Sequence, residues 1–237
     1  IQENPVAIKN IQQKIERLKQ NKIKYELLEE ELKNSGEPQI STTDADARAL
    51  LVQGQVVEVS YNIQAAVDSK HNLVVATHTI NRNDKNALAA IALEVKENLT
   101  LETFTVLVDK GYHNGRELHT CKQNNITTIV AVPEQGKSNE NGTQPEYLVS
   151  KFIYNKENNS YTCPEGKTLT TTGRWHKKTG RTEESGYQFQ KYRTPACKTC
   201  PVKDLCTSRK GGREIDRSQY ADAVEENHKR YKDNPQL

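Results

Sequence analysis

Residues 106–112 read Val-Leu-Val-Asp-Lys-Gly-Tyr, an apolar run that ends in a carboxylate and is soon broken by a glycine. The run predicts a strand at residues 103–108 that delivers Asp109 at its carboxyl end. Many enzymes built on sheets present a metal ligand at this position. One aspartate does not make a site, so its meaning depends on carboxylates carried by neighbouring segments. The candidates are Asp44, Asp46, Asp68 and Asp84.

The composition limits the class of protein. Hydrophobic residues make up 34% of the 237 residues and charged residues 27%, and the mean hydropathy is −0.87. No apolar run approaches the roughly 20 residues that cross a bilayer, so we expect a cytoplasmic protein without membrane contact. The net charge of +3 is too small to indicate nucleic-acid binding by itself. Because the chain begins at Ile1 and contains no methionine, we expect a piece of a longer protein.

The first segment, residues 1–36, predicts an amphipathic helix, paired or coiled. Ile8, Ile11, Ile15 and Leu18 follow one another at spacings of three and four residues among Lys, Glu and Gln. Turn residues at 34–38 end the segment. The simplest interpretation is a docking or linker helix without catalytic residues.

Residues 41–134 change to short β-rich runs. Residues 47–52 predict a strand, although their Ala and Leu content also suits the start of a helix. The further predicted elements are strands at 56–67 and 73–80, a helix at 85–99 capped by Asn83 or Asp84, the strand before Asp109, a helix at 115–123 and a strand at 127–132. A strand meander followed by alternating strands and helices predicts an α/β fold with a mixed sheet, the order of a ribonuclease H-like core.

The remaining residues predict a linker at 135–150, a cysteine-rich insertion at 151–212 and a charged helical segment at 213–237. The insertion contains Cys163 in Cys-Pro-Glu-Gly, the pair Cys197 and Cys200 at C-x2-C spacing, and Cys206. Four thiolates at such spacings suit a tetrahedral structural Zn2+, and free thiols without metal are the alternative. The fifth cysteine, Cys121, lies in a helical run and predicts a core thiol.

Basic and aromatic residues alternate in the insertion, as in surfaces that follow a phosphate backbone and stack on bases. A solvated surface is the alternative interpretation. The residues are Arg174, Trp175, His176, Lys177 and Lys178, then Tyr187, Phe189 and Tyr192, then Arg209, Lys210, Arg213 and Arg217; the last helix adds His228, Lys229, Arg230 and Lys232.

Four ordered motifs resemble one known family. They are Thr-Asp-Ala-Asp-Ala-Arg at 43–48, Tyr-Asn-Ile-Gln-Ala-Ala-Val-Asp at 61–68, Asn-Asp-Lys at 83–85 and Asp-Lys-Gly-Tyr at 109–112. In this order they resemble the DDE transposases of bacterial insertion sequences. The resemblance is greatest to the group with a cysteine-rich insertion after the second catalytic aspartate, and it extends from about residue 41 to the carboxyl end.

The resemblance implies a ribonuclease H-like core that cuts transposon ends and joins them to target DNA, as a homodimer in the synaptic complex. It implies two Mg2+ ions held by Asp, Asp and Glu: Asp46 as the first ligand, with Asp44 as the alternative, and Asp109 as the second. The family's glutamate, in a Glu-x-x-Phe-Gly type motif, is not found, so we expect impaired catalysis. The alternatives are an inactive DNA-binding remnant and a metal-dependent nuclease without strand transfer.

The aspartates also have simpler interpretations. Asp109 suits a polar strand end before a glycine turn, and Asp46 suits a helix N-cap. The composition of residues 68–72 predicts that Asp68 is a turn residue. Asp84 suits a cap, with a supporting role near the metals as the alternative.

Overall fold

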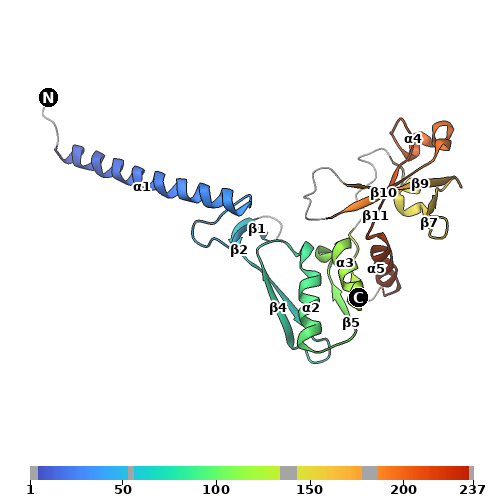
Figure 1. Ribbon diagram of the computed structural model, residues 1–237, viewed down its shortest axis with the longest axis horizontal. Coiled ribbons are helices and arrows are strands. Elements are labelled where there is room, and N and C mark those ends of the chain that lie inside the picture. Colours follow the sequence, from blue (N-terminus) through green and yellow to red (C-terminus); the bar gives the residue numbers. More distant parts are fainter. Residues whose placement is uncertain (1–4, 53–55, 134–142, 178–185, 235–237) are drawn as a thin grey trace. The chain divides into compact units, whose positions relative to one another are not determined.

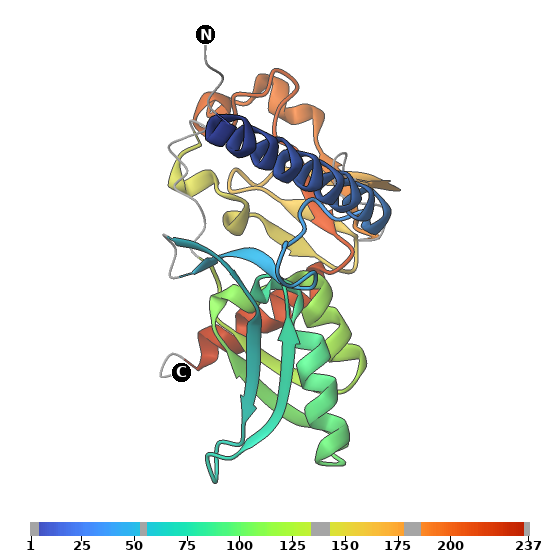
Figure 2. The same ribbon diagram turned by 90° about the vertical axis from the view of Figure 1, so that its left-hand side faces the viewer.

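The computed structural model describes residues 5–52, 56–133, 143–177 and 186–234, apart from the side chains of residues 5–8. The chain divides into two compact units, Ile1–Asn98 and Leu99–Leu237. The expected core at 41–134 is therefore shared between the two units. Figures 1 and 2 show the elements of each unit from two directions. No helix in the described ranges is long and apolar enough to cross a membrane.

The first unit begins with the expected helix, α1 (Pro5–Ser35), a single long rod in Figure 1. Strands follow: β1 (Arg48–Val52), β2 (Val56–Ser60), β3 (Asn62–Val67) and β4 (Val74–Ile80). Residues 48–52 therefore form a strand, in agreement with the first of the two interpretations. The strand expected at 56–67 is interrupted at Tyr61, so that β2 pairs antiparallel with β1 and β3 pairs antiparallel with β4.

Helix α2 (Leu88–Asn98) supplies the core of the first unit. It buries five residues of one face, and it contacts β3 and β4. The buried residues are Leu88, Ala89, Ile91, Ala92 and Val95. Spacings of three and four residues place these side chains along one stripe of the helix. A short 3-10 helix, Asp84–Asn86, precedes α2, and Asn83 caps it by accepting a hydrogen bond from the Lys85 N–H.

The second unit begins with a parallel β-α-β arrangement. Strand β5 (Phe104–Val108) pairs with β6 (Ile126–Val130), and α3 (Gly115–Gln123) connects them. Helix α5 (Ala221–Asp233) packs against both α3 and β6. Helix α3 agrees with the prediction at both ends. In the described residues β3–β4 and β5–β6 are separate two-stranded sheets rather than parts of one mixed sheet.

The cysteine-rich region folds as an antiparallel sheet with the strand order β11-β10-β9-β8-β7. Its strands are β7 (Ile153–Asn155), β8 (Ser160–Thr162), β9 (Thr168–Lys177), β10 (Gln188–Arg193) and β11 (Ile215–Ser218). The sheet packs on a cluster of Phe152, Tyr161, Leu169, Tyr192 and Ile215. The segment from residue 213 was predicted to be helical, but residues 215–218 form β11 because Ile215 completes this cluster.

Candidate metal and DNA site

The two candidate metal ligands belong to different units, so each is described within its own. Asp46 lies in the first unit, in the loop before β1. Arg48 Nη1 donates to the carbonyl oxygens of Ala45 and Ala47 at 2.6 and 2.9 Å, and the Asn81 side chain donates to the Asp46 carbonyl oxygen at 2.8 Å. These bonds fix the backbone that carries the Asp46 carboxylate.

The structure distinguishes Asp44 from Asp46. The Tyr61 hydroxyl donates to both carboxylate oxygens of Asp44 at 2.9 Å, and the Asp46 N–H donates to Asp44 Oδ1 at 3.1 Å. Desolvation raises the pKa of Tyr61, and its bond to Asp44 raises it further, so the phenol remains a proton donor near neutral pH. Asp46 instead lines an open cavity of about 490 Å³ together with Asn81 and Asn83. Asp44 therefore acts within the loop, whereas the Asp46 side chain is exposed at the cavity.

Two amides hold a further carboxylate in this unit, a feature that sequence reasoning missed. Asp84 Oδ1 accepts hydrogen bonds from Asn62 Nδ2 at 2.7 Å and Gln64 Nε2 at 3.1 Å. Gln64 is buried, and its Oε1 atom has no partner in the described structure. The Tyr-Asn-Ile-Gln motif and the Asn-Asp-Lys motif thus meet through these side chains. The signal was available in the sequence, because Asn62 and Gln64 fall on the same face of a strand at spacing two.

The turn prediction for Asp68 is confirmed, whereas the cap prediction for Asp84 is wrong. Asp68 is a turn residue, as predicted: its Oδ2 accepts from the His71 N–H at 2.7 Å, and this backbone bond is the main reason that the pKa of Asp68 is lowered. Asp84 does not cap the 3-10 helix, because Asn83 has that role and the Asp84 carboxylate is engaged by Asn62 and Gln64.

Asp109 follows directly after β5, as the sequence predicted. Its Oδ1 accepts a hydrogen bond from the Gly111 N–H at 2.7 Å and caps the 3-10 helix Lys110–Tyr112. The residue is exposed. Asp109 is therefore a polar residue at the end of a strand, as the simple interpretation predicted. The cap uses one of its two carboxylate oxygens, so the other oxygen can still bind a metal ion. Both Asp46 and Asp109 offer the hard oxygen ligands that Mg2+ prefers.

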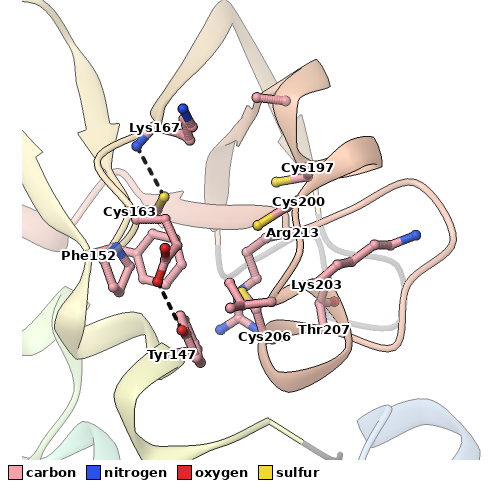
Figure 3. A pocket seen from close by; sticks show the side chains of 14 residues that line it. Tyr147, Phe152, Cys163, Lys167, Cys197, Cys200, Lys203, Cys206, Thr207 and Arg213 are labelled. Carbon is pink, nitrogen blue, oxygen red and sulfur yellow. Dashed lines mark hydrogen bonds between the residues drawn. The ribbon is translucent and has the colours of Figure 1, made fainter.

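The four insertion cysteines line one small cavity of about 30 Å³, shown in Figure 3. Cys163 Sγ accepts a hydrogen bond from the Lys167 N–H at 3.3 Å. Burial raises the pKa of Cys206, which favours its neutral thiol. Gly212 has φ +93°, and a Cβ there would lie 2.3 Å from the Cys197 Cβ, so glycine permits this close approach.

No group of three or more His, Cys, Asp or Glu in the described ranges is arranged to hold a metal ion. The structure therefore does not support the predicted zinc site, although Cys163, Cys197, Cys200 and Cys206 share a cavity. All five cysteines are free thiols. Cys121 is a buried core thiol, as expected, and burial raises its pKa to about 12.

The predicted DNA surface is only partly available. Arg217 is buried and pairs with Asp222 and Glu225, while Tyr192 and Phe189 are buried in the sheet. Arg209 pairs with Glu214 at 2.8 Å. Arg217, Tyr192 and Phe189 are buried, so they stabilise the fold and are not available for phosphate contacts or base stacking. The Arg209 side chain is 58% exposed beside its ion pair, so the prediction of a phosphate contact there stays untested. Trp175 on β9 is 47% exposed, and Arg174 and Lys177 beside it are exposed. Lys178 lies outside the described residues.

Comparison with known proteins decides the family. The model of the transposase DDE domain matches residues 37–204, which include both Asp46 and Asp109. The chain belongs to this family. DDE transposase domains act in the transposition of DNA and generally use Mg2+. No curated protein matches the chain. No solved structure matches it either.

The family match extends through the first three cysteines of the insertion and ends before Cys206. The mixture of helices and several small sheets in this DDE domain is consistent with a ribonuclease H-like fold. The expectations of DNA as the partner and of transposition as the reaction are supported at the level of the family.

Proposed function

We propose that this chain is part of an insertion-sequence transposase, in which Asp46 and Asp109 are the first two metal-binding carboxylates of the DDE site. The observation that carries the proposal is the family match over residues 37–204, together with the exposed Asp46 carboxylate at an open cavity. The DNA substrates are the transposon ends and the target, and the complex that joins them contains two copies of the chain.

The roles follow from the chemistry of phosphodiester cleavage. Bound Mg2+ activates the attacking water or 3′-hydroxyl and stabilises the leaving oxygen. Asp46 and Asp109 would hold the ions through free carboxylate oxygens. Asp44, fixed by Tyr61, would orient the loop that presents Asp46. The Gly111 N–H would hold one oxygen of Asp109 and direct the other outward. The third carboxylate of the family was not found in the sequence, so we expect weak catalysis from residues 1–237 alone.

Metal binding tests the proposal without requiring catalysis. Titration with Mn2+, followed by electron paramagnetic resonance, would measure binding to the native chain and to single variants. We expect Asp46→Asn and Asp109→Asn each to weaken Mn2+ binding about tenfold or more. Asp68→Asn is the control, because Asp68 is a turn residue bonded to the His71 N–H and does not line the cavity beside Asp46, so we expect a change below twofold. Equal binding by all four proteins would refute the assignment of Asp46 and Asp109.

DNA assays separate the proposed transposase from the two alternatives. In Mg2+ the native chain should cut DNA at transposon ends and transfer the cut ends to a target, at a low rate. DNA binding without cutting would indicate an inactive remnant. Cutting without transfer would indicate a nuclease. In the same assay, Asp46→Asn and Asp109→Asn should abolish both steps and leave DNA binding within about twofold.

A further inference from the structure

Helix α1 carries a seven-residue repeat whose apolar side chains are exposed from Ile11 to Tyr25. Three of its apolar side chains, Ile11, Ile15 and Leu18, are 58%, 47% and 58% exposed, and Tyr25 is 63% exposed. Counting Ile11 as position d places Ile15 at position a, and it places Leu18, Tyr25 and Leu32 at the three d positions that follow. From Ile11 to Tyr25 this seam is exposed to water, so these apolar side chains do not pack against another element in the described chain.

We propose that α1 pairs with the α1 helix of a second copy of this chain in an antiparallel two-stranded coiled coil. The partner is identified by complementary charge along the helix. The amino-terminal half, residues 5–20, is basic, with Lys9, Lys14, Arg17 and Lys19 against Glu16. The carboxyl-terminal half, residues 21–35, has an acidic excess of one charge, with Glu26, Glu29, Glu30 and Glu31 against Lys22, Lys24 and Lys33. Antiparallel pairing places each basic half beside an acidic half.

The two charged residues within the seam also favour this orientation. Lys22 and Glu29 occupy a positions. A parallel dimer would place Lys22 against its own copy and Glu29 against its own copy, which juxtaposes like charges in the centre of the interface. A full antiparallel overlap instead places Lys22 beside Leu18 of the second copy and Glu29 beside Ile11. The aliphatic stem of Lys22 can then cover the leucine while its ammonium group reaches water.

Ion pairs within α1 already partner these seam charges. Lys22 lies 3.7 Å from Glu26, and Glu29 lies 2.6 Å from Lys33. Each partner is four residues on, at the edge of the seam, so neither charge enters the interface without a counter-ion. The remaining layer of the overlap brings Ile15 against Tyr25. The interface would extend for about 45 Å along the helix axis. The inference stands on α1 alone and does not depend on the DNA chemistry.

Sedimentation equilibrium of the 237-residue chain tests the pairing. We expect the native chain to be dimeric at micromolar concentration and Leu18→Gln to weaken self-association about 100-fold or more, because each dimer loses two buried leucines. Leu27→Gln is the matched control: Leu27 is 62% exposed on the same helix but lies away from the seam. A monomeric native chain, or equal weakening by both variants, would overturn the proposal.

Cross-linking with a short bifunctional thiol reagent tests the orientation. A mixture of Ile11→Cys and Glu29→Cys chains should give covalent dimers, because the two positions face each other in the antiparallel overlap. Ile11→Cys alone should give no more than the native chain, whose own thiols provide the background. Efficient linkage of Ile11→Cys to itself would show a parallel pair and refute the proposed orientation.

Discussion

The side chain of Asn227 takes the place of a neighbouring strand at the open edge of β6. Its Oδ1 accepts from the Val130 N–H at 2.9 Å, and its Nδ2 donates to the Val130 carbonyl oxygen at 2.9 Å. Three residues later, Arg230 Nε donates to the carbonyl oxygen of Thr128 at 2.8 Å. Residues 128 and 130 present their backbone groups on the same edge of the strand. Helix α5 thus covers an edge that would otherwise be free to pair with other strands.

Removal of the Asn227 amide should destabilise the second unit strongly. Asn227 is fully buried, and Asn227→Ala would leave both backbone groups of Val130 without partners. We expect a loss of about 3 kcal/mol in the free energy of unfolding, measured by urea denaturation. Glu226→Gln on the same helix is the control. Its ion pair with Lys122 is about half exposed, so its loss should cost less than about 1 kcal/mol. Equal losses would contradict the assigned role of Asn227.

Arg217 should be essential for holding α5 against the insertion sheet. Its guanidinium stacks 3.6 Å from the Tyr154 ring centroid, donates to the Tyr161 hydroxyl at 3.0 Å and pairs with Asp222 and Glu225 on α5. Arg217→Lys keeps the charge but loses the planar fork and the stacking. We expect about 2 kcal/mol of destabilisation, measured by thermal and urea unfolding. An unchanged Arg217→Lys protein would show that charge alone suffices.

Gly212 should control the cysteine cavity. Gly212→Ala adds a Cβ 2.3 Å from the Cys197 Cβ and forces a positive φ on alanine, whereas Gly211 has open space and an ordinary φ. We expect Gly212→Ala to lower the unfolding midpoint of the insertion and to alter the reactivity of Cys197 toward thiol reagents. Gly211→Ala should leave both close to native. Disruption by Gly211→Ala alone would contradict the assigned close contact.

Thiol labelling should distinguish the five cysteines and reveal any bound metal. Cys121 is 1% exposed with a pKa of about 12, so we expect no reaction with iodoacetamide in the native chain at pH 8. Cys163, Cys197 and Cys200 are half-buried and should react, and Cys206 should react more slowly because burial raises its pKa. Mass spectrometry of the digested protein measures each rate. Protection of all four that a zinc chelator reverses would restore the zinc prediction.

Glu214 should make the free energy of unfolding fall at acidic pH. Burial alone would raise the pKa of Glu214, but hydrogen bonds from Arg209 and Lys191 outweigh it and lower the pKa to about 2. A lowered folded-state pKa means that the carboxylate stabilises the fold above its ordinary pKa, near 4.5, and that this contribution disappears as the pH falls toward 2. The stability difference between native and Glu214→Gln chains, from urea unfolding, should shrink across that range. A constant difference would argue against the ion pairs.

The sequence predicted most local elements because they depend on local patterns. The apolar spacing of α1, the strand that ends at Asp109 and the helix at 115–123 all follow from side-chain periodicity and turn residues. The strand β11 was missed, since only Tyr161, Leu169 and Tyr192, all distant in sequence, give Ile215 a place to be buried.

The sequence by itself determined the family motifs, their order and the residue types that suit metal and DNA. Only the tertiary structure decided which of those side chains remain available. Tyr61, seventeen residues beyond Asp44, engages that carboxylate and leaves Asp46 exposed. Arg217 is buried because it donates hydrogen bonds to Tyr161, Asp222 and Glu225, and its basic character in the sequence does not predict these contacts. The physical reason is that hydrogen bonds and ion pairs form between side chains that lie close together in the folded chain. The periodicity of the sequence does not show which distant residues become neighbours.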